Sequence, residues 1–251
     1  MQDSYLYGKN AVIEALQAGS ELEKIYIQFG ANESFVKKVK MLAKQSGIQV
    51  VLYDKKKFLN LEQSLEDRSA KTQGIIAQKP VVKYISLAEM AAKALSEEEK
   101  PVLLALDGIT DPHNLGAIAR TAFCAGVKGI ILPERNSAPV NAVSVKTSAG
   151  AIEHIPIAKE SNLSNSFEYL KEQGFWIIGT DIDTKQTIYD EKFDAPVVLV
   201  IGSEGKGMRP GVKKNCDILV KIPMKGKLDS LNASVSAGVV LFEILRKRNY
   251  Q

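Results

Sequence analysis

The sequence is poor in the residues that carry redox, metal and hydrolytic chemistry. Its 251 residues include two cysteines, two histidines and one tryptophan. Cys124 and Cys216 stand far apart, with no CxxC pair and no Cys/His cluster, so neither a disulfide framework nor a zinc site is indicated. The histidines, His113 and His154, do not share a spacing that assembles a Ser-His-Asp arrangement. The sequence therefore gives no support to a metal site or to a serine hydrolase.

Long apolar runs are also missing. No segment approaches the ~20 apolar residues that a bilayer-spanning helix needs, and the start Met-Gln-Asp-Ser-Tyr lacks the basic and apolar segments of a secretory signal. The content of 45% apolar and 25% charged residues is ordinary for a globular protein. We expect a cytoplasmic protein with no membrane partner.

A strong excess of one charge is absent as well, because the net charge is only +4. Residues 1–80 hold twelve Lys+Arg against nine Asp+Glu, and the remainder holds 21 against 20. The excess lies toward the N-terminus, in Lys37, Lys38, Lys40, Lys44 and the run 55–57. Such clusters indicate either solvated helix faces or phosphate contacts. Charge alone leaves both interpretations open.

Residues 1–80 have the pattern of a small α/β domain. Apolar residues recur at helical spacing from Ala11 to Leu16 and from Val36 to Ala43, and strand-like segments cover 25–27, 48–52 and 73–77. Residues 81–100 contain a short helical pattern and the charged segment 97–100, which predict a linker.

Residues 101–251 alternate between strand and helix patterns. The continuous apolar run 102–106 is typical of a strand buried on both faces. Further strands are predicted near 129–132, 155–158, 175–179, 197–201 and 218–222, with helices near 114–126, 140–149, 163–173 and 232–247. We expect a mostly parallel sheet covered by helices, with ligand sites at the strand ends.

Three separated segments place polar residues or glycines at such positions. They are Asn114–Arg120, the loop Gly202-Ser-Glu-Gly-Lys-Gly207, and Ile222-Pro-Met224 followed by Ser230–Ser234. The loop is not a P-loop, because two residues rather than four separate its first glycine from Gly-Lys, and no Ser or Thr follows that lysine. A GxGxxG dinucleotide fingerprint after a strand is absent too.

Each segment has a purely structural interpretation. Asn114, Ser230, Asn232 and Ser234 are good helix caps, and the glycines are suited to a tight turn. Arg120 could be a surface ion-pair partner, although a lone Arg in an uncharged stretch is often reserved for a carboxylate or phosphate. The strand end at 222–224 exposes backbone groups, since Pro223 donates no hydrogen bond.

Together, the three segments resemble the motifs of the SpoU/TrmH (SPOUT) family of RNA ribose 2′-O-methyltransferases. The stretch Tyr7–Leu16 is similar to the start of that family's small RNA-binding domain. The resemblance implies an L30e-like domain over 1–80 and a trefoil-knotted methyltransferase domain over 101–251. It also implies S-adenosylmethionine as cofactor, RNA as substrate, and a homodimer with its active site at the subunit interface. Because it spans nearly the whole chain, it favours a guanosine of large-subunit ribosomal RNA as the target.

The resemblance also assigns roles to residues. Arg120 corresponds to the family's catalytic arginine, and four residues form a polar ring around it: Asn114, Glu204, Ser230 and Asn232. The positions that hold or line the methyl-donor site are Thr180, Gly202, Gly207, Ile222, Met224 and Leu231. A guanidinium with a pKa above ~12 is a poor general base. Our hypothesis is that Arg120 binds the neighbouring phosphate and polarises the ribose hydroxyl.

Three alternatives stay open. The substrate could be transfer RNA, or the chain could be a non-catalytic RNA-binding or ribosome-assembly protein that has kept the motifs without the activity. A nucleotide-binding enzyme of another class is weakened by the failed P-loop and dinucleotide fingerprints.

Overall fold

The chain folds into two compact units, residues 1–81 and 82–251. The structure is a computed structural model that describes residues 5–20, 22–65, 71–226 and 230–249. Each unit has its own sheet and its own core, so each is described by itself.

The first unit contains a four-stranded sheet in the order β1-β4-β2-β3. Strands β1 and β2 run antiparallel to β4, and β2 runs parallel to β3. The strands are β1 (Tyr5–Tyr7), β2 (Lys24–Gln28), β3 (Gln49–Tyr53) and β4 (Ile75–Gln78). The three strands predicted here are confirmed, and β1 is an addition.

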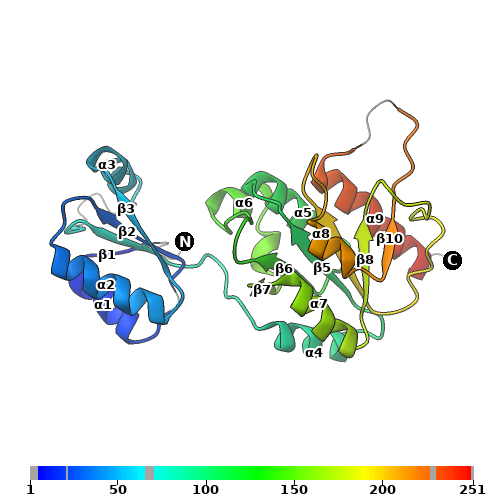
Figure 1. Cartoon of the computed structure of the whole chain (residues 1–251), viewed down its shortest axis with the longest axis horizontal. Helices are drawn as coiled ribbons and strands as arrows, with labels where there is room; N and C mark the ends of the chain where they lie inside the picture. Colours follow the sequence, from blue (N-terminus) through cyan, green and yellow to red (C-terminus); the bar gives the residue numbers. More distant parts are fainter. Residues whose placement is uncertain (1–4, 21, 66–70, 227–229, 250–251) are drawn as a thin grey trace. The chain divides into compact units, whose positions relative to one another are not determined.

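Helices cover both faces of this sheet (Figure 1). Helices α1 (Lys9–Gln17) and α2 (Glu33–Gln45) lie on one face, where Ile25 and Ile27 join their core. Helix α3 (Lys55–Gln63) lies on the other, where Phe58 packs with Tyr26. Because side chains alternate along a strand, β2 supplies both cores. The lysine run 55–57, read in the sequence only as charge, is the first turn of α3.

The second unit contains a six-stranded sheet whose strands all pair in parallel. The order is β10-β8-β9-β5-β6-β7, which confirms the predicted parallel α/β fold. The strands are β5 (Val102–Asp107), β6 (Gly129–Pro133), β7 (Ile157–Glu160), β8 (Trp176–Thr180), β9 (Val197–Gly202) and β10 (Ile218–Val220).

Helices lie on both faces of this sheet (Figure 1). One face carries α4 (Leu87–Glu97), α7 (Leu163–Glu172) and α8 (Pro210–Lys214). The other carries α5 (Pro112–Cys124), which packs against both α6 (Ala142–Thr147) and α9 (Ala233–Asn249). A single 3-10 turn, η1 (Ala151–Glu153), precedes β7. The central strand β5 is buried along its whole length, which explains its uninterrupted apolar run.

The segment 81–100, expected as a linker, carries a helix of the second unit's core. Helix α4 buries Leu87, Met90, Ala91 and Ala94 against β5, β6 and β7. Gly129 on β6 has no side chain because the sulfur of Met90 would lie 2.4 Å from an added Cβ. The charged end of this segment is also engaged, since Lys128 contacts both Glu97 and Glu98.

The start of α5 differs from the sequence prediction. Asp111 caps the helix by accepting a hydrogen bond from the backbone N–H of His113 at 3.0 Å, and Pro112 occupies the first turn. The prediction that Asn114 caps the helix was wrong, because Asp111, three residues earlier and followed by Pro112, fulfils that role. The side chain of Asn114 therefore has another partner, described below.

In the described part of the chain, no helix is both long and apolar enough to cross a bilayer.

Candidate active site

The sheet of the second unit reverses its direction of growth between β5 and β9. From β5 the chain adds β6 and β7 on one side, whereas β9, β8 and β10 lie on the other. Asp107 and Gly202, the last residues of β5 and β9, face each other in register. Ligands of open parallel sheets bind at the carboxyl ends of the strands where the order reverses. All three sequence segments begin at this edge or in the loops that leave it.

Three polar side chains from the three segments meet at this edge. The Nδ2 of Asn232 donates to the Oδ1 of Asn114 at 3.1 Å and to the Oε2 of Glu204 at 3.3 Å. These residues are separated by up to 118 positions in the sequence. An amide nitrogen carries two protons, so both bonds form at once. The structure thus brings Asn114, Glu204 and Asn232 into one cluster.

The orientation of the Asn232 amide is set by helix α9. Its Oδ1 accepts from the backbone N–H of Ser234 at 2.9 Å and from the Ser234 hydroxyl at 2.6 Å. A backbone N–H can only donate, so the oxygen must face the helix and the nitrogen must face Asn114 and Glu204. Capping and site formation, which the sequence presented as alternatives, are both carried out by this side chain.

A buried carboxylate holds the loop that carries Glu204. Asp107 is fully buried, and its oxygens accept from the backbone N–H of Arg209 and from the Arg209 Nε, both at 2.7 Å. The charge-assisted bonds join the end of β5 to the end of the loop that follows β9. Neither Asp107 nor Arg209 was predicted from the sequence as a site residue. A carboxylate at the end of an otherwise apolar strand was the available signal.

The loop after β9 folds back on the strand that it leaves. Ser203 and Gly207 exchange two backbone hydrogen bonds, at 3.0 and 2.8 Å. A Cβ on Gly202 would lie 2.3 Å from the carbonyl carbon of Gly207, so only glycine fits. Gly205 and Gly207 have positive φ values of 77° and 66°, which glycine adopts without strain. The chain's own backbone is therefore the close neighbour of Gly202.

Arg120 and Ser230 have no direct bond to the cluster of Asn114, Glu204 and Asn232 in the described part of the chain. Arg120 is an exposed residue of α5, two turns beyond Asn114, and makes no hydrogen bond or ion pair within the described residues. Ser230 is exposed and precedes α9 by three residues. Neither is joined to the cluster by a contact within this single chain. An unpaired guanidinium is available to an incoming anion.

The predicted donor-binding residues follow three neighbouring strands. Thr180 ends β8, and its hydroxyl donates to the Val200 carbonyl at 3.2 Å. Gly202 ends β9 and Gly207 follows it, and Ile222, Met224 and Leu231 follow β10. Since β10, β8 and β9 are adjacent in the sheet, these residues lie at one edge beside the polar cluster. Ile222 and Leu231 are half-buried, and Met224 is 36% exposed, which gives apolar surface beside backbone donors and acceptors.

Helix α6 supports the start of α5 on the other side. A Cβ on Gly116 would lie 2.6 Å from the Ser144 carbonyl oxygen, so the two helices pack closely at this glycine. The Nδ1 of His113 lies 3.3 Å from the Thr147 hydroxyl. His154 is exposed and packs on Phe123.

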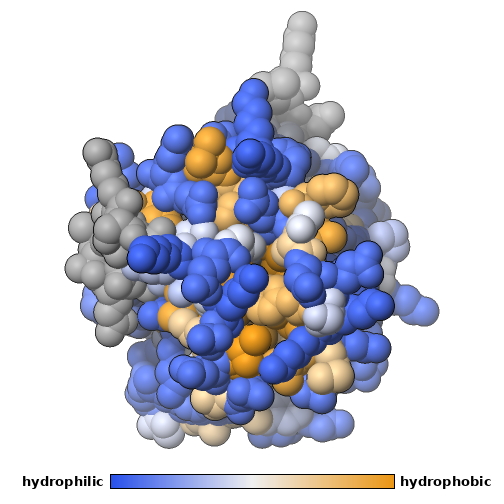
Figure 2. Space-filling view, turned by 90° about the vertical axis from the view of Figure 1, so that its left-hand side faces the viewer, coloured by the Kyte–Doolittle hydropathy of each residue, from blue (hydrophilic) through white to orange (hydrophobic). Residues whose placement is uncertain are grey.

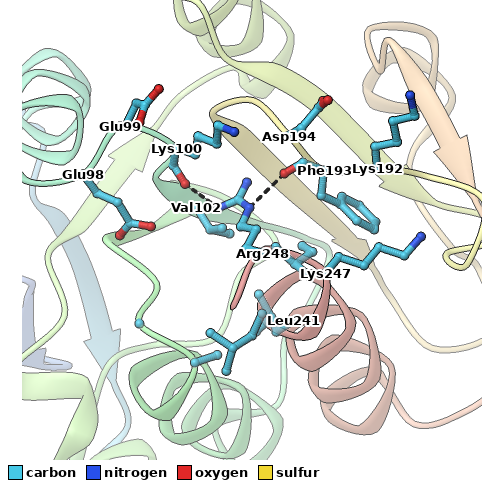
Figure 3. A pocket seen from close by; sticks show the side chains of 14 residues that line it. Glu98, Glu99, Lys100, Val102, Lys192, Phe193, Asp194, Leu241, Lys247 and Arg248 are labelled. Carbon is cyan, nitrogen blue, oxygen red and sulfur yellow. Dashed lines mark hydrogen bonds between the residues drawn. The ribbon is translucent and has the colours of Figure 1, made fainter. Parts of the chain in front are cut away.

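A cavity of about 770 Å³ lies at the opposite end of the sheet (Figure 3). None of the predicted site residues lines it. Its arginine, Arg248, donates to the carbonyls of Phe193, Ala195 and Lys100, and Lys247 donates to those of Tyr189 and Glu191. These bonds tie α9 to the chain before β9. Lys247 and Arg248 thus have a structural role, because they bind the carbonyls of other segments.

Sequence comparison decides the family. The profile of the SpoU rRNA Methylase family matches residues 101–242, and the profile described as RNA 2′-O ribose methyltransferase substrate binding matches residues 5–84. The chain belongs to the SpoU methylase family. This confirms the resemblance inferred from the three motifs. The SpoU methylase fold thus places the cluster of Asn114, Glu204 and Asn232 in an RNA methyltransferase.

Relatives and solved structures match over almost the whole chain. The TrmH-family protein YacO of Bacillus subtilis (strain 168) is 42% identical over 99% of this chain and 97% of its own length. A TrmH-family relative from Staphylococcus saprophyticus is 38% identical over 100% of this chain and 98% of its own.

Among solved structures, the AdoMet-bound rRNA methyltransferase of Sinorhizobium meliloti is 25% identical, with a TM-score of 0.62, over 100% of this chain and 89% of that one. The AviRb methyltransferase of Streptomyces viridochromogenes in complex with AdoMet has a TM-score of 0.60 and 23% identity over 98% of this chain and 90% of that one. It shares the fold.

Proposed function

We propose that this SpoU methyltransferase transfers a methyl group to a ribose 2′-hydroxyl of RNA, and that the target is a guanosine of large-subunit ribosomal RNA. S-adenosylmethionine is the methyl donor, and its methyl group is bonded to a positively charged sulfonium sulfur. The observation that carries the proposal is the cluster of Asn114, Glu204 and Asn232 at the strand-end edge. A methyl transfer to an alcohol needs alignment more than acid–base machinery, and a rigid polar cluster supplies alignment.

The chain's residues fit the donor chemically. The half-buried Ile222 and Leu231 offer an apolar surface to the adenine base of the donor. Backbone groups around Pro223 can form hydrogen bonds with the polar edge of that base. The carboxylate of Glu204 is held by Asn232, where it favours a nearby positive charge. We propose that Thr180, Gly202, Gly207, Ile222, Met224 and Leu231 hold the donor, and that Asn114, Glu204, Ser230 and Asn232 position the hydroxyl beside Arg120.

We propose that the enzyme is a homodimer whose sites lie at the subunit interface. The exposed surface of α5 and α9 supports this, because Phe123, Phe242 and Val235 are 49%, 49% and 50% exposed. Arg120 lies three residues before Phe123, on the same side of α5. A second copy covering this surface would bury the apolar side chains and bring its Arg120 toward a site. Sedimentation of Phe242→Asp tests this: a wild-type monomer contradicts the proposal, and dissociation of the variant supports it.

Ribosomal RNA is proposed over transfer RNA because of the first unit. The Sinorhizobium rRNA methyltransferase matches 100% of this chain, whereas the TrmH/SpoU tRNA modifying enzyme of A. aeolicus, 28% identical with a TM-score of 0.56, matches 64% of it. A substrate domain shared with the former favours its class of substrate. We further propose that the first unit is an L30e-like RNA-binding domain, that the methyltransferase domain contains a trefoil knot, and that the protein is cytoplasmic. Tracing the whole chain in an experimental structure tests whether the domain is knotted. Cell fractionation tests whether the protein is cytoplasmic.

Transfer of a radiolabelled methyl group tests the activity. The purified protein is incubated with labelled S-adenosylmethionine and with ribosomal or transfer RNA from a strain lacking its gene, and the 2′-O-methyl positions are mapped. Label at one guanosine of large-subunit RNA is expected. Label on transfer RNA, or on a base atom, overturns the corresponding part of the proposal.

A non-catalytic RNA-binding role is the remaining alternative. Calorimetry with S-adenosylhomocysteine separates the two, since an enzyme binds this product and a protein that has lost the activity and its donor site does not. Absence of binding by the folded wild-type protein would exclude the proposed activity.

A further inference from the structure

One end of the first unit's sheet gathers segments that are distant in sequence. Strands β1, β2 and β3 all finish there and β4 begins there, because β4 alone runs in the opposite direction. Hydrogen bonds join the segments in a row: Gly8 donates to the Ile75 carbonyl, Gln28 to the Gly74 carbonyl and Phe29 to the Tyr53 carbonyl. In Figure 2 the left-hand side of Figure 1 faces the viewer, and apolar patches there are surrounded by hydrophilic residues.

Phe29 projects from this end into solvent. It directly follows β2 and is 75% exposed, which is more than any other large apolar side chain of the described residues. Its backbone N–H is bonded to Tyr53 at 2.7 Å, so the position of the ring's attachment is fixed. Exposure of an aromatic ring costs hydration free energy without helping the fold. A ring held in this way is ready to stack on a planar partner.

Five lysines lie next to the strand ends that meet at this end of the sheet. Lys9 follows β1, with its Nζ 5.1 Å from the centroid of the Phe35 ring, and Lys55, Lys56 and Lys57 follow β3. Lys71 precedes β4 and is exposed. We define the strand-end surface as Phe29 together with these five lysines. It arises from topology, since its members come from four separate parts of the sequence.

The described acidic groups at this end do not balance the lysines. Asp54 caps α3 through the backbone N–H of Lys57 and pairs with the Lys57 ammonium at 3.8 Å. Glu33 is exposed in the first turn of α2, and Glu62 bonds the Thr72 hydroxyl. Lys9, Lys55, Lys56 and Lys71 have no ion pair with a described carboxylate. Among the residues that the structure describes, the charge at this end is therefore mainly positive, beside an exposed aromatic ring.

We propose that the strand-end surface binds an unpaired segment of the substrate RNA, with one base stacked on Phe29 and its flanking phosphates on the lysines. An aromatic platform bordered by cations is the arrangement that holds single-stranded nucleic acid without reading its sequence. A base must leave its helix to reach the ring, so a loop or bulge binds and a perfect duplex does not. The proposal rests on RNA being the substrate, and it adds which end of the domain holds the RNA and in which form.

Binding by the full-length protein tests the role of the ring. The probe is a fluorescein-labelled RNA hairpin with an unpaired loop, compared with a perfect duplex of the same length. Phe29→Ala is expected to weaken hairpin binding roughly 5- to 100-fold, the effect of losing one base–aromatic stack. The control is Met41→Ala, which removes a side chain 58% exposed on α2, away from this end. Equal affinities of Phe29→Ala and wild type, or equal losses in both variants, would overturn the proposal.

A pair of charge-matched variants tests the lysines. Lys56→Ala with Lys71→Ala removes two charges at the surface, and Lys40→Ala with Lys44→Ala removes two from the later turns of α2. The first pair is expected to reduce the slope of log affinity against log salt by about 0.7 per lysine, and the second to leave it nearly unchanged. Identical slopes would mean that phosphates contact another face.

Cross-linking locates the contact independently of affinity. A 4-thiouridine in the hairpin loop is expected to cross-link within the peptide that contains Phe29, and not within the α2 peptide that contains Met41. If the enzyme methylates RNA but Phe29→Ala has no effect, this inference alone fails. If the hairpin binds through Phe29 and no methyl is transferred, the proposed activity fails and this surface stands.

Discussion

Asp107 and Arg209, which lie 102 residues apart, lock the end of β5 to the loop that carries Glu204. The carboxylate is fully buried, whereas the Arg209 side chain is 50% exposed. One partner is thus fully desolvated and depends on the other for its counterion. The pair links the core of the sheet to the geometry of the candidate active site.

Removal of the arginine should therefore leave a buried charge. Arg209→Ala is expected to lower the free energy of unfolding by about 2 kcal/mol, a value reduced from that of a fully buried pair because Arg209 meets solvent. Adding Asp107→Asn should recover part of the loss, since a neutral amide needs no counterion. Urea denaturation of both single variants and the double variant measures this coupling. Strictly additive losses of unfolding free energy would contradict the coupling. Arg135→Ala, at an exposed arginine, serves as the control and should change the free energy of unfolding by less than ~0.5 kcal/mol.

Asn232→Asp separates the two roles of one side chain. Aspartate keeps the oxygen that caps α9 but places a second oxygen against Asn114 and Glu204, where the amide donated two bonds. We expect near-wild-type thermal stability and a loss of methyl transfer of about 100-fold or more. Asn232→Ala should lose both properties. Full activity in the aspartate variant would show that the donor contacts of Asn232 are dispensable.

Arg120→Lys tests whether the planar guanidinium matters. Lysine keeps the charge but cannot form two parallel hydrogen bonds to a phosphate. We expect turnover to fall about 100-fold while affinity for S-adenosylhomocysteine stays unchanged, because Arg120 makes no hydrogen bond or ion pair with the donor-side residues that the structure describes. Arg135→Lys, an exposed arginine of the same unit, provides the control. Near-full turnover would rule out the proposed two-point contact.

Cys216 should make the protein sensitive to alkali. Burial, together with the neighbouring Asp217 carboxylate, raises the pKa of its thiol from 9.0 to about 12. The neutral thiol is favoured in the folded state, so its contribution is complete below pH 9 and is lost as the pH rises toward 12. Wild-type protein should lose more unfolding free energy than Cys216→Ala between these values. Tyr26, whose pKa burial also raises to about 12, remains in the variant and keeps part of the slope. Parallel curves would contradict the role of the thiol.

Much of the fold could be predicted because the sequence patterns are local. The apolar run of β5 and the helical spacing of α1, α2, α4 and α7 identify these elements directly. Strand β1 was missed because three residues at a sheet edge are too few to show alternation. Helix α3 was missed because its first turn is three lysines, and its apolar residues Phe58 and Leu61 come later.

The sequence predicted which residues belong to the candidate site better than it predicted the hydrogen bonds between them. Asn114, Glu204 and Asn232 were assigned to one polar ring by the family resemblance, and the structure supplies the bonds between them. Asp107 was missed because its partner lies 102 residues away, and no local pattern reports such a pair. The cap of α5 was misplaced because Asp111 and Asn114 are both good caps, and only the backbone decides between them.

Because Asn232 holds the first turn of α9 with its oxygen and binds Asn114 and Glu204 with its nitrogen, the polar cluster and the last helix form together. A chain in which that turn has frayed keeps both of its sheets but has no aligned amide between Asn114 and Glu204. Loss of helical order at this single turn should therefore inactivate the enzyme well before the protein melts.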